Sequence, residues 1–385
     1  MDDLNIAIDA SRLDSGGGLA HLLGVLDIAD PSVHRIREIH IWGSRKLLGI
    51  LPDHPWLIKH NPPAYEKSIP ALLLWQATRL AHEIRRAGCQ ILFAVDGITL
   101  CRFRPMVTLN HSLLPFEDRI MPLYGQSRER WRLRVLAAIQ KRVFRYADSV
   151  IFLTRYAREL VQRHTGVLAD TVVIPHGVGE EFKRAGPPVC TDFVPGKPIR
   201  CLYVSPLFEY KYNWKLVGPI ARLRAQGLDI TLDLVGGVGR ARARAMLDQE
   251  LALYDPGRKF VTVHAFLPHE EIVRRVAQAD IFLFASGCET FGIALLEAMA
   301  AGVPIACSNR SSLPATLQDG GEYFDPEDAA SIAAAIDRLV QDPGRRQALA
   351  ARAWELARQY SWATCAALTW RTVARCHDGF TRRPA

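Results

Sequence analysis

The chain has 385 residues, more than a single compact core usually holds, so two α/β domains are expected. Apolar residues make up 49% of the sequence and charged residues 23%, and no apolar run is long enough to cross a bilayer. Eight scattered cysteines without a Cys-x-x-Cys pair, and the lack of a signal peptide, indicate a cytoplasmic protein with reduced thiols. The formal charge of +8 leaves nucleic acid, an anionic membrane and phosphate-bearing substrates open as partners.

Short β-rich runs alternate with helical patterns along the chain, which predicts the α/β class with parallel sheets wound by helices. Residues 1–180 and 199–360 are predicted to form one domain each. Proline and glycine are concentrated between Gly177 and Pro198, which predicts a linker over 181–198. The predicted strands are Leu4–Ile8, Ile39–Trp42, Ile91–Val95, Met106–Leu109, Ser149–Leu153 and Val172–Ile174 in the first half, and Arg200–Val204, Thr231–Val235, Phe260–Val263, Ile281–Phe284 and Val303–Ala306 in the second.

A glycine-rich loop, Gly16-Gly17-Gly18, follows the first predicted strand and precedes an apolar helical run. The third glycine of a dinucleotide fingerprint would stand at His21, and the Gly-Lys-Ser/Thr ending of a P-loop is absent. A second loop, Gly237–Gly239, lacks the third glycine as well. A nicotinamide site is therefore not expected, while a flexible surface turn remains open for the first loop.

A polar tripeptide, Asn110-His111-Ser112, ends another predicted strand. The carboxyl edge of a parallel sheet is where α/β proteins usually bind ligands, so His111 is a candidate site residue. A purely structural histidine is the alternative.

A strongly basic segment over Arg128–Arg145 is predicted to be helical, with apolar residues at helical spacing. Only Glu129 opposes its basic residues. Such a helix suits an anionic membrane surface, and a core-facing helix with a solvated basic back is equally open. The apolar positions are Trp131, Val135, Leu136, Ile139 and Val143.

The segment Ser286–Pro304 has the pattern of a loop after a strand, then a helix, then a helix stop. Gly302 suits the left-handed position that ends a helix, and Pro304 prevents continuation. The loop and the N-terminus of the helix would present backbone N–H groups to a phosphate. Glu297 stands inside an apolar helix, where a carboxylate needs partners that vicinal ribose hydroxyls can supply.

Glu289 and Glu297 form a Glu-x7-Glu pair, with Phe291-Gly292 after the first and Glu-Ala-Met-Ala-Ala-Gly-Val-Pro starting at the second. This resembles the donor-site signature of the retaining family-4 glycosyltransferases. The resemblance implies a GT-B fold, that is, two Rossmann-like domains with a deep interdomain cleft, and a final helix over 361–380 that packs back on the first domain. It also implies that Glu289 is catalytic, at the sugar end of the donor, and that Glu297, Phe291, Gly292 and Ile293 bind the donor. A capped helix with two solvated acids is the alternative.

Lys211 follows the first strand of the second half and matches the basic residue with which this family neutralises the donor diphosphate. Many relatives also carry an arginine beside a glycine a few residues earlier, where this chain has Ser205-Pro206. The resemblance assigns Gly17, Gly18 and Ser205 to donor binding and places His111 near the reacting sugar. It reads Pro175-His176-Gly177-Val178 as a hinge. A surface lysine is the alternative for Lys211.

The resemblance implies a retaining, metal-independent hexosyltransferase, and no Asp-x-Asp motif is present. It implies no cofactor beyond a nucleotide-sugar co-substrate, with GDP-mannose expected first and UDP-sugars next. The acceptor would be a glycan or a polyprenyl-diphosphate-linked sugar of a cell-surface polysaccharide such as lipopolysaccharide, reached from the inner face of the membrane. Nucleic-acid binding is not expected, because no recognised motif accompanies the basic residues. A GT-B-type nucleotide-sugar epimerase and a non-catalytic nucleotide-sugar-binding protein remain as alternatives.

Overall fold

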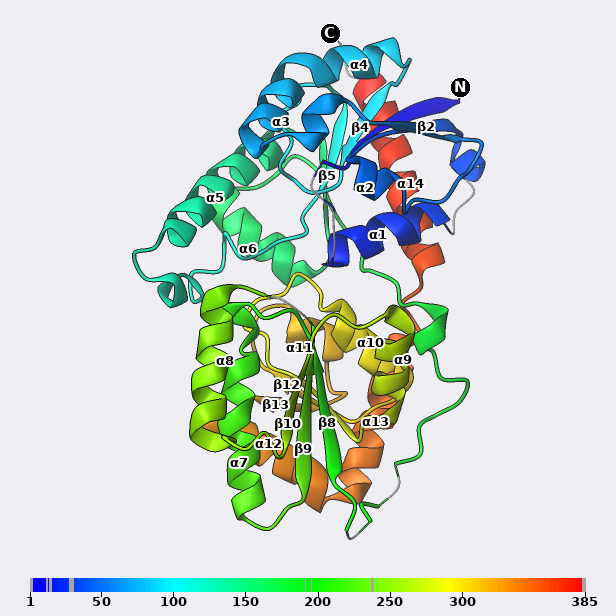
Figure 1. Cartoon of the computed structure of the whole chain (residues 1–385). Helices are drawn as coiled ribbons and strands as arrows, with labels where there is room; N and C mark the ends of the chain where they lie inside the picture. The colour runs from blue at the N-terminus through cyan, green and yellow to red at the C-terminus, as the bar shows by residue number, and fades with distance from the viewer. Residues whose placement is uncertain are drawn as a thin grey trace. The chain divides into compact units, whose positions relative to one another are not determined.

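The computed structural model describes residues 3–382 except 12, 14–15, 28–30, 191, 195 and 237–238, and its contacts divide the chain into two compact units. Unit 1 comprises residues 1–118, 124–177 and 360–385, and unit 2 comprises 119–123 and 178–359. Each unit is a parallel sheet with helices on both faces (Figure 1).

In its described part, unit 1 holds a seven-stranded sheet in the order β3-β2-β1-β4-β5-β6-β7. The order reverses between β1 and β4, and the central strand β4 is buried along its whole length, as expected for a parallel strand covered on both faces. The strands are β1 (Leu4–Asp9), β2 (Ile36–Trp42), β3 (Leu57–His60), β4 (Ile91–Ala94), β5 (Met106–Leu109), β6 (Ser149–Phe152) and β7 (Thr171–Val173). The helices are α1 (Gly16–Asp27), α2 (Arg45–Leu48), α3 (Ile69–Trp75), α4 (Ala81–Arg86), α5 (Arg128–Tyr146), α6 (Arg155–Thr165) and α14 (Trp362–Thr381).

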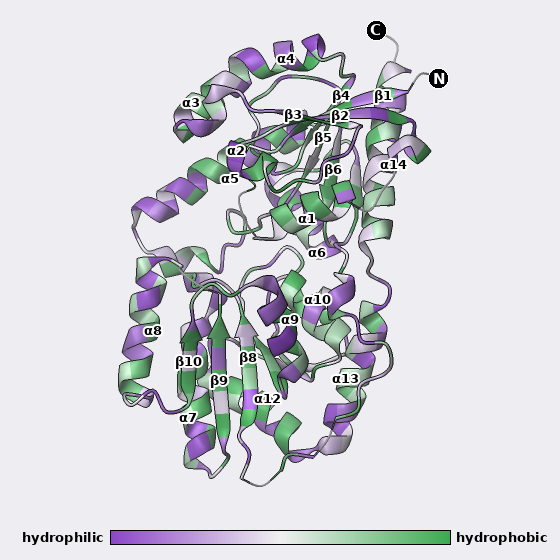
Figure 2. Cartoon of the chain, turned by 45° about the vertical axis from the view of Figure 1, so that its right-hand side comes forward, coloured by the Kyte–Doolittle hydropathy of each residue, from purple (hydrophilic) through white to green (hydrophobic). Residues whose placement is uncertain are grey.

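The described residues of unit 2 form a six-stranded sheet in the order β10-β9-β8-β11-β12-β13, which reverses between β8 and β11. Strands β8 to β10 are largely apolar, while hydrophilic residues mark the helices around them (Figure 2). The strands are β8 (Ile199–Val204), β9 (Ile230–Val235), β10 (Val261–His264), β11 (Ile281–Phe284), β12 (Ile305–Ser308) and β13 (Glu322–Phe324). The helices are α7 (Val217–Ala225), α8 (Ala241–Tyr254), α9 (His269–Gln278), α10 (Ile293–Ala301), α11 (Leu313–Leu317), α12 (Ala329–Gln341) and α13 (Pro343–Ala357).

The C-terminal helix α14 belongs to unit 1, where it packs on α1. A close backbone approach makes this possible: a Cβ on Gly177 would lie 2.1 Å from the backbone nitrogen of Trp362. Only glycine therefore fits at residue 177.

The segment predicted as a linker is fixed to unit 2 in its described part. The Gln347 side chain, on α13, accepts from the Cys190 N–H at 2.6 Å and donates to the Pro188 carbonyl at 2.7 Å. The buried Arg346 guanidinium lies 4.1 Å from the centre of the Phe193 ring. The proline- and glycine-rich composition therefore marks irregular backbone held on a helix by side chains, and not a free tether.

Candidate functional site

Two polar loops leave the carboxyl edge of the unit 2 sheet where the strand order reverses. One follows β8 and carries Lys211, and the other follows β11 and carries Glu289. Because β8 and β11 are neighbours in the sheet, the loops meet, and Lys211 and Glu289 form an ion pair. Their side chains are only 12% and 13% exposed, so this pair is shielded from solvent far more than a surface ion pair. Such a reversal point is where open α/β sheets bind ligands.

The Lys211 loop is held by backbone contacts on both sides. The buried Tyr203 hydroxyl donates to the Lys211 carbonyl at 2.8 Å, and the Gly287 N–H of the neighbouring loop donates to the Tyr210 carbonyl at 2.7 Å. Tyr212 then turns the chain with a left-handed φ of 52°. This backbone conformation costs free energy in a non-glycine residue and is characteristic of functional sites.

Helix α10 begins directly after the Glu289 loop, as the sequence pattern predicts. Gly292 precedes it with a φ of 91°, and Gly302 ends it with a φ of 71°, so the predicted left-handed stop at Gly302 is confirmed. Phe291 is buried and Ile293 half-buried. No side chain of the described residues caps the first turn, so its N–H groups can receive an anion.

Glu297 is half-buried on α10. Burial raises the pKa of its carboxyl to about 7, the nearby His269 acts in the opposite direction, and Glu181 adds to the rise. No described residue donates a hydrogen bond to this carboxylate. A desolvated carboxylate without donors is costly, and two vicinal hydroxyls of a ligand would satisfy it.

The raised pKa of Glu297 gives a pH-dependent expectation. Ligand hydroxyls prefer the ionised carboxylate, so affinity should increase as pH rises through 7, by up to about tenfold per unit below the pKa. Calorimetry at pH 6, 7 and 8 should use an intact nucleotide sugar, whose diphosphate diester does not itself titrate in this range. Glu297→Gln should abolish the slope, and the same slope in that variant would assign it to another group.

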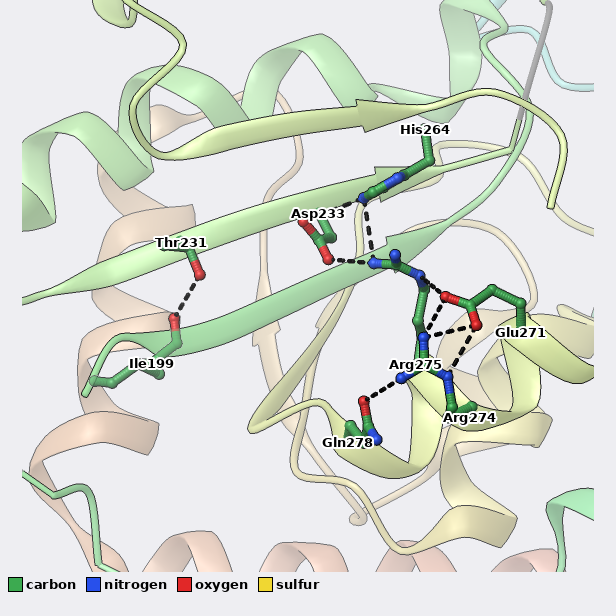
Figure 3. Close-up of polar contacts among 8 residues, drawn as sticks. All are labelled: Ile199, Thr231, Asp233, His264, Glu271, Arg274, Arg275 and Gln278. Atoms are coloured by element: carbon green, nitrogen blue, oxygen red, sulfur yellow. Dashed lines mark hydrogen bonds and ion pairs between the residues drawn. The ribbon is translucent and has the colours of Figure 1, made fainter.

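Figure 3 shows how side chains of helix α9 are tied to strands β9 and β10. Arg275 donates to Asp233 of β9 at 2.7 Å and to Glu271 at 2.8 Å, and it lies 3.2 Å from the His264 ring nitrogen of β10. The helix is thereby tied to the sheet, and its first residue, His269, pairs with Glu181 at 2.7 Å. His269 and its partner Glu181 are the two residues that, besides burial, affect the pKa of Glu297.

Ser205 lies at the end of β8, in the same loop as Lys211. It is buried, its hydroxyl donates to the Pro206 carbonyl at 3.3 Å, and it offers no positive charge in place of the missing arginine. Arg240, which follows β9, brings a guanidinium to this loop: it lies 5.7 Å from the Phe208 ring centre, and that ring stacks on Tyr210 at 5.8 Å. Arg240 was not among the predicted site residues, because only the strand order places it beside this loop.

In unit 1, the half-buried His111 belongs to a cluster with two buried histidines, His21 and His176. Its ring centre lies 5.3 Å from that of His21 and 5.9 Å from that of His176, and Trp362 of α14 packs against His176 at 5.5 Å. Burial lowers the pKa of His111 to about 4 and those of the other two well below their usual value, so all three are neutral at pH 7. The cluster was missed because three distant segments contribute to it, and His176 was read only as part of a hinge.

The glycine-rich loop leads into this cluster. Helix α1 already begins at Gly16, Gly17 is exposed, and Gly18 lies against the His111 ring, which a Cβ on Gly18 would approach to 3.6 Å. Gly18 and His111 are therefore neighbours in unit 1, while Lys211, Glu289 and Glu297 lie in unit 2.

Helix α5 has the predicted basic character but a different buried face. Its buried residues include Leu133, Ala137 and Val143, whereas Trp131 is 68% exposed and Val135 is also exposed. Of the five apolar positions at helical spacing, Val143 is buried, whereas Trp131 and Val135 share the outer face with arginines, so the core-facing alternative does not account for these two residues. No helix in the described part of the chain has the length and hydropathy needed to span a bilayer.

Comparison with known proteins agrees with these features. The family model "Glycosyl transferases group 1" matches residues 192–355, and "Glycosyltransferase Family 4" matches 38–182. The O-antigen chain mannosyltransferase B of Escherichia coli is 31% identical over 194 residues, 46% of this chain and 50% of that protein. The GDP-mannose-dependent alpha-(1-6)-phosphatidylinositol monomannoside mannosyltransferase of Mycolicibacterium smegmatis is 28% identical over 250 residues, 60% of this chain and 63% of that protein. The matches thus span half to under two thirds of these relatives.

Among solved structures, a sucrose-phosphate synthase from Thermosynechococcus elongatus superposes with a TM-score of 0.79 at 19% identity, covering 98% of this chain and all of that one. This likeness concerns the fold, which is GT-B, with two parallel-sheet α/β domains. The two family models cover most of the chain without overlap, one in each half. The chain belongs to family 4 of the glycosyltransferases, the glycosyltransferase group 1 family.

Proposed function

We propose that the protein is a retaining hexosyltransferase that takes its sugar from a nucleotide-sugar donor bound by unit 2. The observation that carries the proposal is Glu297, a half-buried carboxylate without a donor among the described residues and with a pKa raised to about 7. Ribose hydroxyls would satisfy it, and the uncapped first turn of α10, four residues earlier, would receive the diphosphate.

The chemistry follows from where charge develops. The bond between the anomeric carbon and the diphosphate oxygen breaks, the acceptor oxygen bonds to the same face of the sugar, and its proton passes to the departing phosphate. Negative charge grows on the diphosphate, which Lys211 and the α10 N–H groups would stabilise. No pair of carboxylates is needed as acid and base, in contrast to glycosidases. Neutral His111 would contact the reacting sugar as a hydrogen-bonding group.

The donor we propose first is GDP-mannose, with UDP-sugars as the next candidates. Two of the similar proteins are mannosyltransferases by name, and one is named as GDP-mannose-dependent. The acceptor we propose is a glycan or a polyprenyl-diphosphate-linked sugar used in cell-surface polysaccharide synthesis. The O-antigen relative supports this class of acceptor by its name.

A lipid-linked acceptor would require contact with a membrane, and the outer face of α5 supports such contact. This face combines the exposed Trp131 and Val135 with the exposed Arg128, Arg134 and Arg142. Aromatic and aliphatic side chains among arginines suit the headgroup region of an anionic bilayer better than water.

Vesicle binding tests this surface. The protein should pellet with phosphatidylglycerol vesicles at low salt and be released at high salt, because each engaged arginine contributes roughly 1 kcal/mol. Replacing Arg128, Arg134 and Arg142 by Gln should abolish pelleting and leave donor binding intact. The matched control replaces Arg222, Arg242 and Arg244 of unit 2 by Gln. These arginines are also exposed, so the control removes the same number of positive charges. Equal loss in both triple variants would mean that net charge, and not α5, controls binding.

A donor screen tests the function itself. Among common nucleotide sugars, the true donor at one hundred times its Kd should stabilise the protein by roughly 2.7 kcal/mol in thermal unfolding. Release of the nucleoside diphosphate should then require an acceptor lipid extract. Release without any acceptor and with epimerisation of the sugar would indicate an epimerase, and stabilisation without turnover would indicate a binding protein.

A further inference from the structure

The loop after β12 contacts Glu289 through two neighbouring serines. The Ser311 hydroxyl accepts from the Glu289 N–H at 3.1 Å and donates to the Glu289 carbonyl at 2.9 Å, and the buried Ser312 hydroxyl donates to the same carbonyl at 2.8 Å. The Thr316 hydroxyl, four residues after Ser312, donates at 2.9 Å to the carbonyl of Phe291, which lies two residues after Glu289. The backbone of the Glu289 loop is therefore bound by hydroxyl groups.

Ser311 makes these bonds from an unfavourable backbone conformation. Its φ is 56°, in the left-handed region that residues with a Cβ rarely occupy. Glycine would adopt this conformation without strain but has no hydroxyl. A strained residue whose side chain bonds both polar backbone groups of a candidate catalytic residue indicates a functional constraint.

The bonds leave little freedom at residue 289. The two serines donate to both lone pairs of the Glu289 carbonyl, and Ser311 also accepts from the Glu289 N–H. The Glu289 side chain pairs with Lys211. Rotation of the peptide would break hydrogen bonds in a half-buried place, where unmade bonds are costly. Fixing the peptide fixes the direction in which the Glu289 carboxylate, and with it the Lys211 ammonium, is presented.

We infer that Ser311 and Ser312 are positioning residues for sugar transfer, acting through Glu289. This rests on the proposed function, since Glu289 would face the sugar of the donor. Neither serine was a predicted site residue, because their sequence separation from Glu289 exceeds twenty residues and only the β11–β12 pairing brings the loops together.

Two substitutions at residue 311 separate positioning from folding. Ser311→Ala removes the hydroxyl and keeps the backbone strain, whereas Ser311→Gly removes the hydroxyl and relieves the strain. The glycine variant should therefore have the higher Tm of the two. Ser312→Ala removes one hydroxyl from unstrained backbone, where φ is −81°. Ser331→Ala is the control, since its hydroxyl bonds the Asp325 N–H at 3.0 Å in the same unit without contacting Glu289.

The experiment measures kcat, KM for the donor and amide hydrogen exchange over residues 286–292. We expect both residue 311 variants to lower kcat roughly ten- to hundredfold with little change in KM, despite their different Tm values, and Ser312→Ala to lower it less. Exchange at Glu289 should accelerate in all three and stay unchanged in Ser331→Ala. If kcat instead follows Tm, so that Ser311→Gly recovers the activity that Ser311→Ala loses, the inference is overturned. Unchanged amide exchange at Glu289 in the serine variants would overturn the inference even if no donor is turned over. Faster exchange in these variants, together with no turnover by the wild-type protein, would contradict only the proposed function.

Discussion

Lys211→Ala should lower kcat by about 10²- to 10³-fold while weakening ground-state binding of the donor much less. The leaving diphosphate gains negative charge as the glycosidic bond breaks, so a fixed ammonium stabilises the transition state more than the bound donor. The low exposure of Lys211 strengthens this effect, because solvent screens its charge only weakly. Steady-state kinetics with the donor identified by thermal shift would measure both quantities.

The matched control for Lys211→Ala is Lys215→Ala, four residues along the same loop. Lys215 has its ammonium 3.3 Å from the Glu327 carbonyl in an exposed place and does not pair with Glu289. Its loss should leave kcat within a few-fold of wild type. A Lys211 variant with a raised KM and unchanged kcat would show that the lysine serves binding alone.

Glu289→Ala should abolish most transfer while sparing, or even tightening, the binding of the free nucleoside diphosphate. In the ligand-free protein the Glu289 carboxylate neutralises Lys211, so its removal frees the ammonium for phosphate. Loss of the carboxylate at the sugar end should lower kcat by about 10²-fold, because misplacing the reacting sugar by about an ångström has this effect. Calorimetry with the nucleoside diphosphate and kinetics with the nucleotide sugar would measure the two effects separately.

Glu327→Ala is the control for Glu289→Ala. Glu327 is an acid close to the same loop, and it accepts from the Tyr212 hydroxyl at 3.2 Å without pairing with Lys211. Glu327→Ala should change neither the affinity for the nucleoside diphosphate nor kcat strongly. If Glu289→Ala weakens binding of the nucleoside diphosphate by the same factor as it lowers kcat, the carboxylate supports the whole binding site and has no separate role at the sugar.

The central strands and α10 were predictable because their patterns are local. Buried parallel strands such as Ile281–Phe284 are continuous apolar runs, and Gly302 followed by Pro304 marks the end of α10. The strands that were missed, β3 (Leu57–His60) and β13 (Glu322–Phe324), are short and lie at the sheet edges. Most of β3 is only half-buried, and β13 begins with the buried Glu322, which pairs with Arg338 and Arg345, so polar residues interrupt the apolar pattern that reveals a strand.

The contacts of the site depend on strand order, which the sequence pattern does not specify. Lys211 and Glu289 were predicted separately, and their pairing follows from β8 lying beside β11. Nothing in the sequence indicates the contacts of Ser311 and Ser312 with Glu289, or those of His21 and His176 with His111, until the sheets are assembled. On α5 the helical spacing was predictable but the buried face was not, since periodicity alone does not say which side of a helix meets the core, and Trp131 lies on the exposed side.

The most direct test of the central claim is the configuration of the transferred sugar. The protein, a membrane lipid extract and the nucleotide sugar that stabilises it most would be incubated together, and the product linkage read by proton NMR alongside nucleoside diphosphate release. An α-configured product from an α-linked donor, formed at the rate of diphosphate release and lost in Lys211→Ala, is the expected result. A β-configured product, or no release with any nucleotide sugar and acceptor extract, would contradict retaining transfer from a donor held by Lys211 and Glu297.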